Sequence, residues 1–276
     1  MFKRDVDVIL ARRHDNGADF WATPDRKLYV GNPFSTIGCL GILHELGVSL
    51  RHEAVQGAIA LILDAACDDG RIRLGPKTPL YPCYTGEALR MLCRFGRVRH
   101  PAVKRTVAHL LETAHPDGGW RCDFTRFGRG PETRCTNPGA TLYILDALRY
   151  TPALREGNRT VDRAVESLLN HWESRVPTGP CHWGIGTLFL QVEYPFLRYN
   201  LFFYTYVLSF FARARRDRRF REALSELQGR CDARGRLVVE RPHRDLRDLE
   251  FCRKGEPSAC ASRRFRDIVG NLESGT

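Results

Sequence analysis

The sequence predicts an all-α protein whose repeated helical hairpins close into a ring. Apolar segments that begin at a proline recur roughly every 50 to 60 residues along the chain. Amphipathic segments alternate with these apolar segments. Strand signals are nearly absent, and the best candidate, residues 236–240, is short. A regular period of this length is typical of repeat architectures in which each unit is one helical hairpin. The apolar segments begin near Pro33, Pro82, Pro138, Pro195 and Pro257.

The first part of the chain contains a short helical pattern and then two complete pairs of helices. The first apolar helix ends at Gly47 and the second at Gly96, because glycine favours the left-handed conformation that ends a helix. Each amphipathic partner leads into a polar turn. The expected helices are Val6–Arg13, Pro33–Leu46, His52–Cys67, Pro82–Phe95 and Pro101–Thr113.

The stretch His115–Leu148 is the most complete junction between two units. Asp117-Gly118-Gly119-Trp120 turns the chain after an amphipathic helix. A polar loop flanked by two cysteines, Cys122 and Cys135, follows this turn, and the next apolar helix begins at Pro138. We therefore expect weaker copies of this junction to join the other units.

The second part of the chain repeats the alternation. A helix that is apolar on most sides must be buried, so we expect the apolar helices inside and their amphipathic partners outside. The chain begins with an outer-type helix and ends with an inner-type helix, which favours closure into a ring of residues 1–276 as one domain. An open solenoid and an irregular helical domain are the alternatives. The expected helices here are Pro138–Leu148, Thr160–Trp172, Pro195–Ala212, Phe220–Leu227 and Ala259–Leu272.

Composition narrows the classes of function. The formal net charge of +11 comes mainly from arginines that are interleaved with acids, and no nucleic-acid-binding motif is present, so we do not expect nucleic acid as a partner. The charged start of the chain argues against a secretory signal. The most apolar run, Leu201–Ala212, is shorter than the roughly 20 residues that a membrane span needs. We therefore expect a cytoplasmic protein, with peripheral membrane contact left open.

Reduced cysteines are expected in this compartment. Three of the ten cysteines occupy apolar helical positions and are expected to be packing residues. These are Cys39, Cys67 and Cys93.

The junction at Asp117-Gly118-Gly119-Trp120 resembles the repeat of the prenyltransferase and squalene-oxidase family. Looser copies occur at Asp69-Gly70-Arg71-Ile72, at Asp15-Asn16-Gly17 and at 232–237. The resemblance covers nearly the whole chain as a fold signal. It implies an α/α toroid of about five to six hairpins, like those of terpenoid cyclases and protein prenyltransferase β subunits. In these toroids the inner helices surround a cavity that is often lined with aromatic residues and suited to isoprenoid chains.

The catalytic motifs of this family have no match in the chain. The segment most similar to an Asp-x-Asp-Asp motif is residues 64–69. The segment most similar to Asp-x-Cys is Glu250-Phe251-Cys252. Candidate proton donors are therefore single carboxyl groups, because a buried carboxylic acid with a raised pKa can protonate an alkene. The candidates are Asp64, Asp123 and Glu193.

The cysteines in turns form a candidate metal site. In a ring of hairpins, the end of each outer helix and the start of the next inner helix lie on the same rim. This placement predicts that five side chains come together on one rim: Cys83, Cys122, Cys135, Cys181 and His182. Thiolates and an imidazole at about 2.3 and 2.0 Å make a tetrahedral zinc site. An iron–sulfur cluster and a set of reduced thiols near helix N-termini are the alternatives.

The candidate ligand contacts are aromatic residues and late arginines. The aromatic residues could line a pocket for an apolar polyene and stabilise carbocations, or form ordinary core. The arginines could bind a diphosphate or another anion, or form a solvated surface. The residues are Trp183, Tyr194, Phe196, Tyr199 and Phe203, together with Arg244 and Arg253.

These observations favour an isoprenoid cyclase- or transferase-type enzyme with a central apolar cavity that takes a hydrophobic, isoprenoid-like small molecule. The alternative is a toroid without catalytic activity that binds a hydrophobic ligand or a protein partner, with any metal purely structural. An enzyme of unrelated chemistry is a third possibility, since a fold does not fix a function.

Overall fold

The computed structural model describes residues 2–121, 135–179 and 181–273. Within these residues the regular secondary structure is helical, which confirms the all-α prediction. The segment 236–240 forms no strand. It contributes only isolated bridges, from Leu237 to Cys231 and from Val238 to Pro257.

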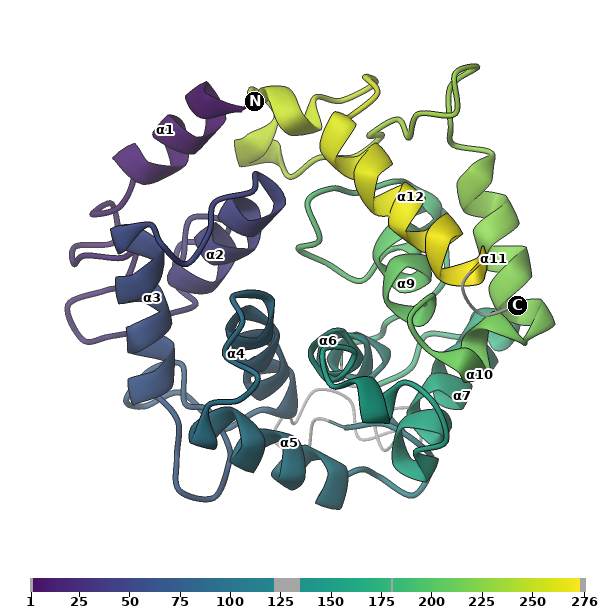
Figure 1. Ribbon diagram of the computed structural model, residues 1–276, viewed down its shortest axis with the longest axis horizontal. Helices are drawn as coiled ribbons and strands as arrows, with labels where there is room; N and C mark the ends of the chain where they lie inside the picture. The colour runs from purple at the N-terminus through teal and green to yellow at the C-terminus, as the bar shows by residue number, and fades with distance from the viewer. Residues whose placement is uncertain (1, 122–134, 180, 274–276) are drawn as a thin grey trace.

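Four helices form the buried centre (Figure 1). Every residue of α6 and of α9 is buried, and most residues of α2 and α4 are too. The apolar character of α2, α6 and α9 on most sides explains their burial, whereas α4 also buries the charged residues Glu87, Arg90 and Arg94. Proline occupies the first turn of α4 and of α6, where its missing N–H has no helical partner in any case. These helices are α2 (Thr36–Glu45), α4 (Pro82–Arg94), α6 (Pro138–Leu148) and α9 (Leu201–Leu208).

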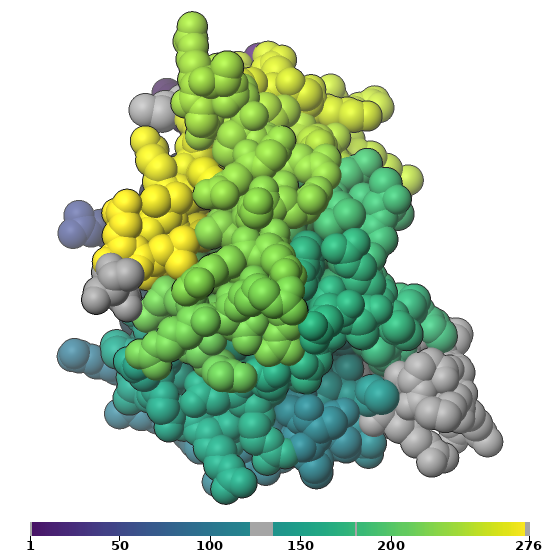
Figure 2. Space-filling model, turned by 90° about the vertical axis from the view of Figure 1, so that its right-hand side faces the viewer, coloured from purple at the N-terminus to yellow at the C-terminus, as the bar shows by residue number. Residues whose placement is uncertain are grey.

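Amphipathic helices lie at the periphery (Figure 1) and bury one face each. Figure 2 shows the segment that contains α10 and α11 covering one side of the molecule next to α12. The basic run in α10 and α11 pairs with acids of the neighbouring α7; Arg219, for example, lies 2.7 Å from Glu166. The outer helices are α1 (Lys3–Ala11), α3 (Glu53–Asp64), α5 (Pro101–Glu112), α7 (Arg159–Ser174), α10 (Ala212–Arg215) and α11 (Arg218–Gln228).

The aromatic helix is shorter than the sequence pattern predicts. α9 begins at Leu201 instead of Pro195, because Asn200 has an extended backbone and its side chain accepts the N–H of Phe203 at 3.0 Å. This N-cap fixes the start of the helix. A separate short helix, α8 (Thr187–Leu190), lies in the preceding connection. Among the described residues no helix combines the length and the apolar character that crossing a membrane requires.

The turn at Asp117–Trp120 is tied to three helices. The Trp120 indole N–H donates to the carbonyl oxygen of Leu110 in α5 at 2.8 Å, and its backbone N–H donates to the Thr141 hydroxyl in α6 at 3.2 Å. Gly118 has a φ of +92° and lies against the backbone of Arg163 in α7. The turn therefore fixes the relative positions of two consecutive hairpins.

The N-terminal helix α1 contacts a segment of the chain that precedes the last helix (Figure 1). The buried carboxylate of Asp5 in α1 accepts the backbone N–H groups of Glu250 and Phe251, at 3.1 and 2.9 Å, in the short 3-10 helix η4 (Glu250–Cys252). The last helix, α12 (Ala259–Glu273), buries only three of its residues, fewer than an inner-type helix should. Most of its other residues are partly buried, and Arg264 reaches Glu45 in the centre.

Candidate functional site

A cavity of about 420 Å³ lies between α2, α4, α6 and the segment 181–198. Its wall is mainly apolar and aromatic, with a small group of charged or ionisable side chains. This combination is typical of small-molecule sites. The cavity opens to the surface near Cys181, which is exposed, and Arg198, whose side chain is 48% exposed. The aromatic lining residues are Tyr29, Tyr84, Tyr143, Trp183 and Phe196, and the charged or ionisable ones include Glu87, Arg90, Arg198 and His243.

Helix α4 brings an acid and a base to the inner wall of this cavity. Glu87 and Arg90 are one helical turn apart and therefore lie on the same face. The Arg90 Nη1 atom lies 3.3 Å from Glu87 Oε2. Both residues are buried, with exposed fractions of 4% for Glu87 and 2% for Arg90. The sequence predicted an apolar cavity, but the wall of this cavity also carries a buried carboxyl group and a buried guanidinium group.

Burial raises the pKa of Glu87 above its ordinary value, and the neighbouring Arg90 and Arg94 oppose this effect without cancelling it. Within the described residues its carboxyl group accepts no hydrogen bond, and Arg90 is its one ion-pair neighbour. A carboxyl group in this setting holds its proton to a higher pH than an exposed one. Glu87 is therefore suited to act as a proton donor toward the cavity.

Arg90 is held in place by its surroundings. Its Nη2 atom donates to the carbonyl oxygen of Phe196 at 2.7 Å, and its guanidinium carbon lies 4.8 Å from the ring centroid of Phe203 and 5.2 Å from that of Tyr143. Its Nε atom lies 3.4 Å from a carboxylate oxygen of Asp146. In the part of the chain that the structure describes, Nε and Nη1 have no hydrogen-bond partner.

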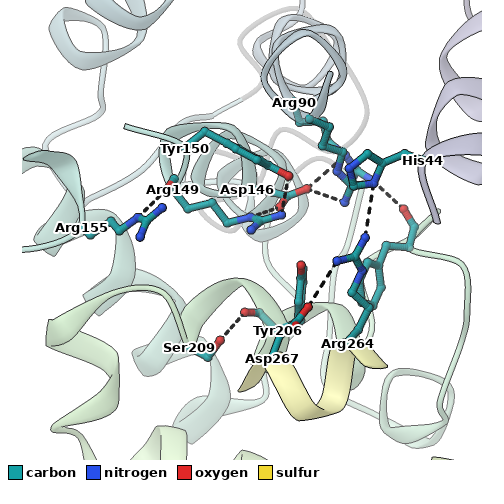
Figure 3. A network of polar contacts seen from close by, with 12 residues as sticks. His44, Arg90, Asp146, Arg149, Tyr150, Arg155, Tyr206, Ser209, Arg264 and Asp267 are labelled. Carbon is teal, nitrogen blue, oxygen red and sulfur yellow. Dashed lines mark hydrogen bonds and ion pairs between the residues drawn. The ribbon is translucent and has the colours of Figure 1, made fainter. Parts of the chain in front are cut away.

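Behind Arg90, a network of buried charges occupies the centre of the molecule (Figure 3). Asp146 of α6 accepts from Arg94 of α4 at 2.8 Å and from Arg149 of α6 at 2.6 Å. The Arg149 guanidinium also donates to the Tyr150 hydroxyl at 2.8 Å. Burial raises the pKa of Asp146, but the three neighbouring arginines outweigh burial and hold it below its ordinary value.

The network continues through Glu45 to the last helix, α12. This α2 residue accepts from Arg264 of α12 at 2.8 Å and from the Tyr194 hydroxyl at 2.6 Å, and Arg94 lies 3.4 Å away. Burial acts to raise the pKa of Glu45, but Arg264, His44 and Arg94 bring it well below its ordinary value. The centre therefore holds ionised carboxylates that join α2, α4, α6 and α12.

The predicted aromatic contacts fall into two groups. Trp183 and Phe196 line the cavity. The other three lie in the surrounding core: Tyr194 donates to Glu45, Tyr199 lies 2.8 Å from His171 Nδ1, and Phe203 packs under Arg90.

The predicted acids do not come together. Asp64 is exposed and lies 2.9 Å from Arg26, beside a separate hollow. Asp123 lies outside the described residues. Glu193 is buried, and its pKa is raised by burial against the opposing effect of Arg198 and Arg241. It is the predicted acid that lies next to a cavity-lining residue, since Arg198 Nε is 3.7 Å from its carboxylate.

The two predicted arginines, Arg244 and Arg253, are exposed and do not line the cavity. Arg244 lies 3.4 Å from Asp245. The neighbouring His243 does line the cavity.

The predicted metal ligands are spread over more than one place. Cys83 and Cys181 line the cavity, Cys135 lines a hollow beside Asp117, and His182 is exposed. Cys122 lies outside the described residues. Among the described residues no group of three or more His, Cys, Asp or Glu side chains could hold a metal ion. A zinc site therefore stays a prediction from the sequence.

Comparison of the chain with models of known protein families found no match, and comparison with curated proteins found none either. The resemblance of its repeat to the prenyltransferase and squalene-oxidase family therefore rests on the sequence pattern alone and stays an expectation.

The charged residues of α4 and α6 are functional candidates that the sequence pattern did not single out. Glu87, Arg90 and Arg94 are spaced three and four residues apart, so they share one face of a helix that was expected to be buried. Charge on one face of a buried helix is the signal that would have identified them, because charged side chains are rarely buried without partners.

Proposed function

We propose that the chain is an α/α toroid enzyme of the isoprenoid cyclase or transferase type, and that Glu87 protonates an apolar substrate in the cavity. The single observation that carries this proposal is a buried carboxyl group with a raised pKa on an aromatic-lined cavity wall. The toroid is supported by the arrangement of buried helices within a peripheral set (Figure 1) and by the contact of α1 with η4.

The proposed step needs no further reactant. The Glu87 carboxyl proton is added to one carbon of a substrate alkene, and the π electrons form the new C–H bond. The adjacent carbon becomes a carbocation, and Glu87 becomes a carboxylate that Arg90 stabilises. Loss of a proton from a neighbouring carbon, to the Glu87 carboxylate, restores the acid and leaves an isomerised or cyclised alkene. The faces of Trp183, Tyr143 and Phe196 would stabilise the positive charge.

The experiment follows carbon-bound deuterium. Farnesol, geranylgeraniol and squalene are each incubated with the protein in D₂O, and the recovered isoprenoid is analysed by mass spectrometry. We expect deuterium on carbon with at least one of them. Glu87→Gln should reduce the rate by about 100-fold or more, as expected for loss of a general acid. Glu112→Gln, which changes an exposed acid of α5, is the matched control.

The predicted acid Glu193 provides a second comparison. If Glu193→Gln abolishes deuterium incorporation while Glu87→Gln does not, the acid has been assigned to the wrong residue. If isoprenoids bind in the cavity but no deuterium reaches carbon, the protein is a binding scaffold, as in the alternative of the sequence analysis. If none binds, the isoprenoid proposal is wrong.

A further inference from the structure

The opening of the cavity carries a guanidinium group with unused hydrogen-bond donors. Arg198 lines the cavity, and its side chain is 48% exposed. Its Nε atom faces Glu193 at 3.7 Å, beyond hydrogen-bond distance. Among the described residues its side chain donates no hydrogen bond. The two Nη atoms of Arg198 are therefore available to a ligand that enters the cavity.

The charge around Arg198 is not balanced by the protein. Glu193 is the acid beside it, and that acid also faces Arg241 at 3.1 Å. Two guanidinium groups thus share one carboxyl group, whose pKa is in addition raised by burial. An excess of positive charge at the opening favours an anionic group there.

A second donor lies near Arg198. His243 lines the same cavity, and its Nδ1 atom accepts the backbone N–H of Asp245 at 3.3 Å. The proton of the neutral ring is therefore on Nε2, which within the described residues has no protein partner. Burial lowers the pKa of His243, and the nearby Arg198 lowers it further, so the neutral ring is favoured. The facing groups are Arg198, Arg244 and Asp245, and Asp245 also pairs with Arg244.

The inner wall offers a different environment. The backbone of Phe196 accepts from Arg90, so residues 196–198 run from the Glu87–Arg90 pair outward to the cavity opening. Much of the remaining wall is formed by apolar side chains such as Met91, Leu197 and Trp183. A ligand that matches this order is apolar along its length and carries its charge at one end.

We propose that the ligand of this cavity is an apolar chain with one terminal carboxylate, which accepts hydrogen bonds from Arg198 and from His243 Nε2. One guanidinium group balances one carboxylate and forms strong, directional hydrogen bonds with it. A diphosphate carries more charge than this opening neutralises. The inference deepens the proposed function, because it names the end of the substrate that is held while its alkene lies near Glu87.

Binding of a fluorescent polyene fatty acid tests the inference without requiring turnover. The probe is cis-parinaric acid, and its methyl ester is the uncharged comparison. We expect the acid to bind the unmodified protein about 10- to 100-fold more tightly than the ester, the range for a charge-assisted hydrogen bond. Arg198→Met should remove this preference and leave binding of the ester unchanged. Arg244→Met, which changes an exposed neighbour outside the cavity, should keep the preference.

Competition separates the sources of negative charge. Farnesoic acid should displace the probe at lower concentration than farnesyl diphosphate does. The opposite order, or equal binding of acid and ester, would overturn the inference. If the carboxylate preference is present while deuterium incorporation is absent, the proposed catalysis fails and the binding inference stands.

Discussion

Single residues at the centre of the molecule carry buried charge. Four guanidinium groups, those of Arg90, Arg94, Arg149 and Arg264, face three carboxyl groups, those of Glu45, Glu87 and Asp146. Removing one partner from such a network is costly, because it leaves the opposite charge buried without compensation. Asp146 is the carboxylate with the most arginine neighbours, since three arginines contact it.

We predict that Asp146→Asn lowers the free energy of unfolding at pH 7 by about 3 to 5 kcal/mol. The substitution should also weaken the dependence of the free energy of unfolding on pH in the acid range. The folded-state pKa values of Asp146 and Glu45 lie below their ordinary values of 3.8 and 4.5. Their stabilisation is complete above those ordinary values and is lost as the pH falls toward the folded-state values. Urea denaturation between pH 7 and pH 3 measures both effects.

The exposed acid Asp7 on α1 provides the control, and Asp7→Asn should keep the acid dependence of the unmodified protein. Glu87 contributes with the opposite sign, since its raised pKa gives stabilisation below its ordinary value that is lost as the pH rises. If the free energy of unfolding of Asp146→Asn falls with decreasing pH as steeply as that of the unmodified protein, the central network does not govern acid unfolding.

At the residue scale the sequence was informative about the aromatic wall but not about the charges. Trp183, Phe196, Cys83 and Cys181 were named from the sequence and line the cavity. Glu87 was not named, because periodicity shows which residues share a helix face but not which face of another helix lies opposite. Which side chain lies closest to a cavity is decided by packing between distant segments.

Helices and turns were predicted more accurately than individual contacts. α6 has the expected bounds, Pro138–Leu148, and α4 differs from expectation by one residue at its end. Proline at the first turn and glycine after the last turn are local signals that act without tertiary structure. The predicted start of α9 at Pro195 was wrong. Proline is common at the start of a helix, but here the Asn200 N-cap fixes the start at Leu201.

We predict that Gly118→Ala destabilises the protein more than Gly47→Ala does. Both glycines have positive φ angles, +92° and +84°, so each substitution costs about 1 to 2 kcal/mol in backbone strain. A Cβ atom at Gly118 would also overlap the carbonyl oxygen of Arg163, whereas one at Gly47 would meet no atom within 4 Å. Thermal unfolding of the two variants measures the difference. Equal melting temperatures would show that the turn does not press on α7.

Over the whole molecule, the all-α class followed from the sequence. The first and last helices were expected to pair with each other, but α1 contacts η4 and α12 packs mainly against α9 and η4. These partners were not expected. Asp5 of α1 binds two backbone N–H groups of η4, and Arg264 of α12 reaches Glu45 of α2. These pairs are separated by more than 200 residues, and no local pattern identifies them.

We predict that Asp5→Ala lowers the free energy of unfolding by about 2 to 4 kcal/mol, because a buried and a partly buried N–H group lose their carboxylate acceptor. Hydrogen exchange of the Glu250 and Phe251 amides should accelerate in this variant. Asp7→Ala, on the exposed side of the same helix, should change neither quantity by a comparable amount. Protection of the two amides that survives in Asp5→Ala would show that the contact between α1 and η4 does not depend on this carboxylate.

The contact between α1 and η4 also affects how the protein unfolds. An open array of hairpins can lose its terminal unit while the remainder stays folded, because each unit contacts only its neighbours. Here α1 is a neighbour of η4, and detaching α12 would leave the carboxylate of Glu45 without Arg264. Local unfolding of either the first or the last helix therefore costs free energy, because each one breaks a contact with a distant segment. The molecule should melt as a single cooperative unit despite its repetitive construction.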